Sequence, residues 1–268
     1  MIFSKDSIAS QVLCSTRHFI PCVENLPVPI DLNYLASCLG YIIEEARIQQ
    51  QGYITDTEDG KRLIRVRIDD PLRVKRFTIA HEIGHILLNI YEKKSCRRAK
   101  KFRLHAYSRE EKIANRLAAE VLMPVSRFRH ELLRHVIPSF ATLGAMAGTF
   151  DVSLIACMRR ITELPDFISF SYLYEFTRRS KDRLEVNLQN RYSSTPNLRF
   201  VEKPSEVVER CYAYSLSKGR NWEGKIRMVA DHQVAIPSFL VTYKKKDKFF
   251  VRLSGWKKSD KAQCKREN

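Results

Sequence analysis

Residues 76–89 read RFTIAHEIGHILLN, and this stretch decides how the rest of the chain is interpreted. Within it, the motif HEIGH at 81–85 holds two histidines four residues apart. Because an α-helix turns once in 3.6 residues, both imidazoles lie on one face, within reach of a single metal ion. Glu82 lies about 100° round the helix from His81, where it reaches a water on the metal without binding the metal itself. The motif therefore predicts a zinc site, bound by His81 and His85, with Glu82 as general base.

The residues around the motif are mostly apolar and cover most of the circumference of a helix predicted from about Val74 to Tyr91. Polar groups buried in such a helix need partners, because an unpaired buried polar group costs several kcal/mol. Gly84 in mid-helix costs about 1 kcal/mol relative to alanine, which indicates that another segment or the substrate comes close there. The apolar surroundings and the mid-helix glycine favour a metal site over two surface histidines that are four residues apart by chance.

A catalytic zinc site needs a third protein ligand. The chain after His85 reads ILLNIYEKKS, so the extended zinc motif with a third histidine is absent, and a glutamate from a later helix is the other standard solution. A helix predicted from Ser108 to just before Pro124 offers Glu110, Glu111 and Glu120.

The choice between Glu110 and Glu111 stays open on geometry alone. Ala114 and Ala118 share a face with Glu111 and would allow close helix packing, but Glu110 has a similar relation to its own apolar neighbours. Glu111 also has a competing role, because Ser108 three residues earlier makes a Ser-x-x-Glu capping box.

Other patterns organise the chain around this motif. Residues 27–46 (PVPIDLNYLASCLGYIIEEA) predict one helix with Asp31 as its N-cap. Residues 52–69 alternate polar and β-branched residues around Asp59-Gly60, which predicts a β-hairpin. Residues 126–136 continue helical, and residues 140–161 predict two short helices hinged near 151–153.

After Leu164-Pro165 the pattern changes to the alternation typical of strands. We expect an α+β protein: a mainly helical metallopeptidase domain with a small antiparallel sheet, a helix-turn-helix-like helical pair, and a β-rich C-terminal domain. The expected parts are an N-terminal segment 1–26, the metallopeptidase domain 27–135, the helical pair 136–164 and a basic C-terminal domain 165–268.

The composition, 44% apolar and 29% charged, is that of a globular chain, and no run of about 18 apolar residues predicts a membrane span. The N-terminus lacks the basic start and apolar core of a secretory signal. Seven cysteines, never spaced as Cys-x-x-Cys, indicate reduced thiols rather than a disulfide framework. We therefore expect a cytoplasmic protein.

The net charge of +17 is spread along the chain. From residue 164 onward there are 22 Lys/Arg against 12 Asp/Glu, with local peaks at 93–103 and in the tail from Lys244. A surplus of this size permits nucleic-acid contact through the basic surface. A charge run is nevertheless more often a solvated face than a binding site.

Three stretches taken together resemble the ImmA/IrrE family of bacterial metallopeptidases: RFTIAHEIGHILLN (76–89), EEKIANRLAAEVLMP (110–124) and VSLIACMRR (152–160). The resemblance covers about residues 27–163, and the C-terminal 100 or so residues match no family by pattern. In that family the glutamate of the Glu-x-x-Ala-Asn element is the third zinc ligand, which corresponds to Glu111 here.

The resemblance thus implies a site in which His81, His85 and Glu111 hold Zn²⁺ and Glu82 is the general base. Mn²⁺ or Fe²⁺ would fit the same ligands. Known family members cut a DNA-binding transcriptional repressor and so release a stress-response or mobile-element programme. The implied function is a regulatory zinc endopeptidase whose partner is a helix-turn-helix repressor or antitoxin-like protein, with no membrane partner.

An alternative is a non-catalytic regulator that binds DNA or protein and keeps only the metallopeptidase fold, although the intact Glu82 argues against loss of catalysis. Residues 140–161 read like a helix-turn-helix, but the first half of its second helix, SLIAC, lacks base-reading polar residues. We therefore expect a structural helical pair or a platform for the repressor. The sequence does not define the group that stabilises the oxyanion. His105 and Tyr107 are candidates, and the alternative is that both are exposed loop residues without a catalytic role.

Overall fold

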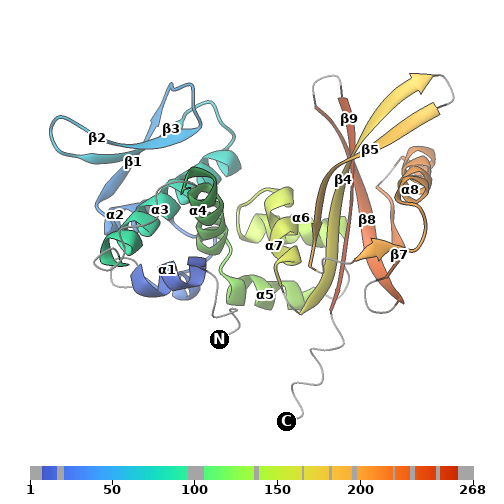
Figure 1. Cartoon of the computed structure of the whole chain (residues 1–268), viewed down its shortest axis with the longest axis horizontal. Helices are drawn as coiled ribbons and strands as arrows, with labels where there is room; N and C mark the ends of the chain where they lie inside the picture. The colour runs from blue at the N-terminus through green and yellow to red at the C-terminus, as the bar shows by residue number, and fades with distance from the viewer. Residues whose placement is uncertain are drawn as a thin grey trace, which may run out of the picture. The chain divides into compact units, whose positions relative to one another are not determined.

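The computed structural model describes residues 8–16, 21–95, 106–135, 139–164, 166–180, 183–194, 198–219, 221–229, 233–245 and 248–258. The chain forms two compact units. Unit 1 comprises Met1–Glu131 with Ala147–Ser153, and unit 2 comprises Leu132–Met146 with Leu154–Asn268. The mixed architecture confirms the predicted α+β class, and each unit is described by itself below (Figure 1).

Unit 1 combines helices with a three-stranded sheet. Its elements are α1 (Ile8–Thr16), the short 3₁₀ helix η1 (Val23–Asn25), α2 (Leu32–Cys38), β1 (Tyr41–Ala46), β2 (Gly52–Asp56), β3 (Arg62–Arg67), α3 (Leu72–Ser95) and α4 (Ala106–Leu122). The sheet packs on α3 through β3, whose Ile64 and Val66 are fully buried, and α4 lies beside α3 (Figure 1). This arrangement places the HEIGH motif between a sheet and a second helix.

The segment predicted as one helix over 27–46 is a short helix followed by a strand. Asp31 is the predicted N-cap, since its carboxylate accepts hydrogen bonds from the backbone N–H of Asn33 (2.9 Å) and Tyr34 (3.2 Å). The helix ends at Cys38, because Gly40 adopts a left-handed conformation (φ 78°) that a helix cannot continue. Residues Tyr41–Ala46 then form β1, so the second half of that prediction was wrong.

The hairpin predicted around Asp59-Gly60 is confirmed. β2 and β3 pair antiparallel, with Gly60 in the left-handed region (φ 78°) at the turn. β1 joins the other side of β3 in parallel, which gives the order β1-β3-β2. The small sheet is therefore mixed, and the prediction of a purely antiparallel sheet was wrong. The parallel strand β1 was not predicted, because its segment has a sequence pattern compatible with a helix.

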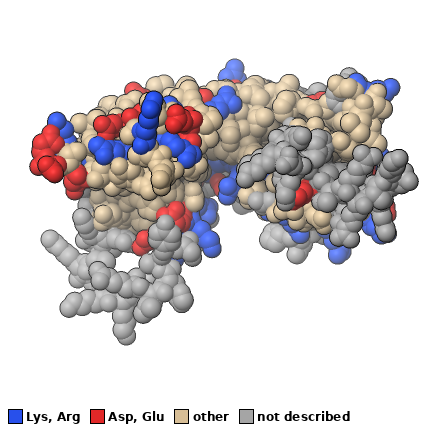
Figure 2. All heavy atoms as spheres, turned by 90° about the horizontal axis from the view of Figure 1, so that it is seen from above, with Lys and Arg blue, Asp and Glu red and all other residues tan. Residues whose placement is uncertain are grey.

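The outer face of this sheet is charge-paired rather than uniformly basic. Arg65 donates to Glu44 (2.6 Å) across β3 and β1, and Lys61 pairs with Asp59 (2.7 Å) in the turn. Figure 2 shows acidic and basic side chains interleaved on this end of unit 1. Paired charges of this kind do not form the continuous basic stripe that a nucleic-acid backbone requires.

Three helices follow along the chain: α5 (Val125–Arg134), α6 (Phe140–Thr149) and α7 (Leu154–Thr162). They match the helices predicted for 126–136 and 140–161. Both arginines of α7 make contacts within unit 2: Arg159 stacks over the ring of Tyr192 (4.7 Å), and buried Arg160 pairs with Glu163 (2.7 Å). These contacts agree with a structural role for α7 more than with base reading.

Unit 2 is built on a six-stranded antiparallel sheet of order β5-β4-β9-β8-β7-β6. Its elements are β4 (Phe167–Ser180), β5 (Arg183–Ser193), β6 (Arg199–Phe200), α8 (Pro204–Lys218), β7 (Glu223–Val229), β8 (Gln233–Lys245) and β9 (Lys248–Lys258). The predicted strands and the β8–β9 hairpin are present. One face carries an aromatic and aliphatic core, and α7 packs against β4 and β5.

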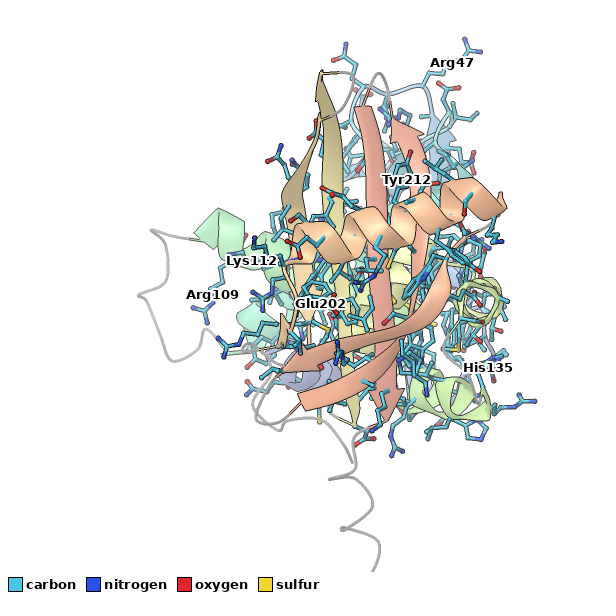
Figure 3. All side chains as sticks on the ribbon, turned by 90° about the vertical axis from the view of Figure 1, so that its right-hand side faces the viewer. Arg47, Arg109, Lys112, His135, Glu202 and Tyr212 are labelled. Atoms are coloured by element: carbon cyan, nitrogen blue, oxygen red, sulfur yellow. The ribbon has the colours of Figure 1, made fainter. Side chains whose placement is uncertain are left out.

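The helix α8 was not predicted. It packs on the sheet core through Val207, Val208 and Cys211, and Figure 3 shows it lying across the strands with Tyr212 along its length. Two sequence signals mark its ends: Pro204 in its first turn and Gly219 in the left-handed conformation after its last turn (φ 62°). These signals were overlooked because the segments on both sides of α8 alternate polar and apolar residues, as strands do.

Within the part of the chain that the structure describes, no single helix has the length and apolarity to cross a membrane. The pair α6 and α7, bent by 100° at their junction, meets that test together by length and composition alone.

Candidate metal centre

The site depends on how closely α3 and α4 approach each other. Along the contact the side chains are small or aliphatic, with Ala114 and Leu117 of α4 fully buried. Gly84 lies in this contact: a Cβ atom there would be 2.9 Å from the carbonyl oxygen of Ala114 and 3.2 Å from Cβ of Leu117. The glycine inside the motif therefore allows α4 to pack against α3, as its position in the sequence predicted.

We expect Gly84→Ala to destabilise the protein by about 1–2 kcal/mol, because overpacking against a backbone carbonyl outweighs the gain in helix propensity. The displacement of α4 is also expected to weaken zinc binding. Thermal unfolding with and without zinc measures both effects.

The matched control is Gly144→Ala in α6, where a Cβ atom meets nothing within 4 Å. This change is expected to stabilise the protein by about 0.5–1 kcal/mol. Equal stabilisation by both substitutions would show that close packing at Gly84 does not position the two helices.

Three side chains converge at the contact between α3 and α4. The Nε2 atoms of His81 and His85 are 3.1 Å apart. The two carboxylate oxygens of Glu111 lie 3.2 Å from these nitrogens, Oε2 from His81 and Oε1 from His85. Among the described residues these three form the cluster of His, Cys, Asp and Glu groups suited to a metal ion.

The spacing of the three groups fits a tetrahedral zinc ion. Ligand atoms about 2.0–2.1 Å from one zinc at tetrahedral angles lie about 3.3 Å from one another. The side chains are 15%, 26% and 33% exposed for His81, His85 and Glu111 respectively. The cluster opens on a cavity of about 580 Å³, so a fourth coordination position would face the solvent.

The electrostatics of His81 suit a neutral imidazole ligand. Burial lowers the pKa of His81, and the neighbouring His85 lowers this pKa further, against the opposing effects of Glu111 and Asn115. A low pKa favours the form whose Nε2 has a free lone pair for a metal. Nδ1 of His81 is buried without a hydrogen-bond partner among the described residues.

Glu82 lines the same cavity as the three clustered side chains without belonging to their group. Burial raises the pKa of the Glu82 carboxyl, and the Glu111 carboxylate raises this pKa further while His85 opposes the rise. A carboxyl group whose pKa is shifted toward neutrality is better suited to exchange protons with a reacting group.

The other candidate residues have different positions. Glu110 and Glu120 do not join the cluster; Glu120 is buried, and Glu110 lines a separate cavity. His105 lies outside the described residues, and Tyr107 lies in the first turn of α4 with a side chain that is likewise not described. Asn115 was not predicted as a site residue; it lies one helical turn after Glu111, borders the cavity and contacts His81. The i, i+4 spacing from Glu111 was the available signal.

The wall opposite α3 is formed by residues 51–54 at the start of β2. Gly52 lets this strand approach α3, since a Cβ atom there would be 2.5 Å from Cγ2 of Thr78. β2 is an edge of the three-stranded sheet, paired only with β3 within the described chain. The other edge of β2 thus has no strand partner among the described residues, and the first residues of the strand border the cavity.

Comparisons with known proteins find a related domain and a related fold. Residues 37–162 match the family model Peptidase_M78, described as an IrrE N-terminal-like domain, which confirms the predicted resemblance over this part of the chain. A Mycobacterium tuberculosis transcriptional regulator of known structure is similar in fold, with 15% identity and a TM-score of 0.53. That match covers 91% of this chain and 75% of the other. A comparison with curated proteins finds no match.

Proposed function

We propose that the protein is a zinc-dependent endopeptidase that cleaves a DNA-binding repressor or an antitoxin-like partner, and the match of residues 37–162 to the model of an IrrE N-terminal-like domain supports this proposal. The observation that carries the proposal is the spacing of 3.1–3.2 Å among His81, His85 and Glu111 beside Glu82. Two imidazoles and one carboxylate form a donor set typical of catalytic zinc, and their number leaves a position for water or substrate.

Glu82 is the residue that moves the proton in this proposal. His81, His85 and Glu111 would hold the zinc, which would supply a water of pKa about 7 and polarisation of the scissile carbonyl. Glu82 takes a proton from the attacking water as the new C–O bond forms, and delivers it to the amine nitrogen as the C–N bond breaks. Its raised pKa favours both transfers, since the carboxyl must accept and then release the same proton.

The substrate is expected to bind in an extended conformation. The open side of β2 offers backbone N–H and C=O groups along one wall of the cavity, so an extended segment can pair with it as an added strand. Such pairing favours a flexible linker or loop of a folded partner over its helices. If the substrate is a DNA-binding protein, cleavage occurs in the compartment that contains the DNA.

The test is cleavage of a purified helix-turn-helix repressor, chosen first from any that is encoded beside this protein. We expect the purified, zinc-loaded protein to cut that repressor at a single position, seen as two fragments by mass spectrometry. Removing zinc with a chelator is expected to stop the reaction, and adding zinc is expected to restore it. The three ligands contribute to the proposed cleavage only by holding the metal. An intact repressor under all conditions, or cleavage that continues after chelation, would contradict the proposal.

A further inference from the structure

A second cavity of about 410 Å³ adjoins the first one in unit 1. The two cavities share His85 and Ile54, so they meet at one of the three predicted metal ligands. The first extends along the N-terminal half of the HEIGH helix, and the second along its C-terminal half from His85 to Ile90. A peptide cleaved at the metal would therefore place a side chain beside its scissile bond into the second cavity.

The walls of this second cavity combine aliphatic and polar side chains, and the aliphatic ones include Leu39, Ile54, Ile86 and Ile90. Two charged side chains also line it. Glu110 comes from α4, next to the predicted ligand Glu111, and Arg62 comes from the start of β3. The chemistry of these two charges decides which side chain the cavity accepts.

The two charges differ in what already surrounds them. Arg62 is exposed, and its guanidinium stacks on the ring of Tyr41, 4.9 Å from the ring centroid. Glu110 is half-buried and, among the described residues, has neither an ion pair nor a hydrogen bond. A half-buried carboxylate gains more from an incoming partner than a solvated guanidinium does, because solvent screens it less.

We propose that the second cavity is the specificity pocket for a residue beside the scissile bond, and that it selects a lysine or arginine whose charged end pairs with Glu110. The proposal rests on the metal-dependent peptidase proposed above. The aliphatic stem of such a side chain packs on the isoleucines of the wall, and its head remains close to solvent. Arg62 opposes this selection, so its removal strengthens the preference.

The test uses amino-acid hydroxamates, which bind zinc and so place their side chains beside the metal without any turnover. Arginine, leucine and glutamate hydroxamates are titrated into the zinc-loaded full-length protein by calorimetry. We expect arginine hydroxamate to bind about five- to tenfold more tightly than leucine hydroxamate, the effect of one partly screened ion pair. Glutamate hydroxamate is expected to bind most weakly.

Two variants assign the preference to its residue. Glu110→Gln keeps the size of the side chain and is expected to bring the arginine-to-leucine affinity ratio close to one. Arg62→Gln is expected to raise that ratio, because it removes the opposing charge. Equal binding of all three probes, a preference for glutamate, or an unchanged ratio in Glu110→Gln would overturn the inference.

Zinc stoichiometry, measured on each sample, separates this result from a failure of the proposed function. A protein that binds no zinc would refute the metal centre, and with it the pocket beside the metal. A protein that binds zinc and the hydroxamates without the arginine preference would refute the pocket assignment alone. Circular dichroism of both variants confirms that they remain folded.

Discussion

Glu82→Gln is expected to reduce cleavage of the partner repressor by about a thousandfold while zinc remains bound. The amide has the size of the carboxylate but cannot accept the proton of the attacking water, and general acid–base catalysis by one side chain contributes about 10²–10⁴ in rate. Glu82 is outside the His81, His85 and Glu111 group, so the substitution leaves the three predicted ligands in place.

Three measurements check this result: initial cleavage rates, zinc content, and repressor binding to the inactive variant. Binding is expected to persist, because the edge of β2 and the second cavity are unchanged and the new amide in the first cavity has the size of the carboxylate. The matched control is Glu58→Gln, which makes the same chemical change at an exposed residue of the β2–β3 turn and is expected to cleave normally. Cleavage at the normal rate by zinc-loaded Glu82→Gln would rule out Glu82 as the general base.

The helical part of the site follows from the sequence because its determinants are local. The helical repeat alone places His81 and His85 on one face. Gly84 in mid-helix predicted the close approach of another segment, and in the structure that segment contains Ala114. Glu111 was different. Helical geometry alone did not distinguish Glu111 from Glu110 as the third ligand. Glu111 was chosen because the Glu-x-x-Ala-Asn element resembles that of the ImmA/IrrE family. In the structure the two adjacent glutamates point to different cavities.

The elements that the sequence did not predict depend on tertiary contacts. Residues Tyr41–Ala46 contain two isoleucines and two glutamates, a pattern compatible with a helix, and they become β1 only because β3 is available for pairing. Helix α8 likewise depends on the sheet core that covers its apolar face. The two cavities also arise from packing between distant segments, which no single stretch of sequence contains.

Glu111→Ala is expected to lower the affinity for zinc by more than about a hundredfold, and cleavage is expected to be lost with the metal. One carboxylate oxygen of Glu111 lies 3.2 Å from Nε2 of His81, and the other lies 3.2 Å from Nε2 of His85. Removing the carboxylate therefore leaves only two of the three predicted ligands. Loss of a group one shell further from a metal already costs about ten- to a hundredfold in affinity. The loss also appears in stability, since zinc at 100 times its Kd stabilises the folded protein by about 2.7 kcal/mol.

Glu110→Ala is the matched control, because it makes the same change one residue earlier in the same helix. Glu110 lines the second cavity and is not part of the three-residue group, so this variant is expected to bind zinc with the affinity of the unmodified protein. Zinc titration with a competing chelator gives the two affinities, and thermal unfolding with added zinc gives the two stabilisations. If Glu110→Ala lost zinc and Glu111→Ala kept it, the assignment of the third ligand would pass from Glu111 to Glu110. Equal loss in both variants would instead indicate a general disturbance of α4, which circular dichroism of the zinc-free variants would reveal.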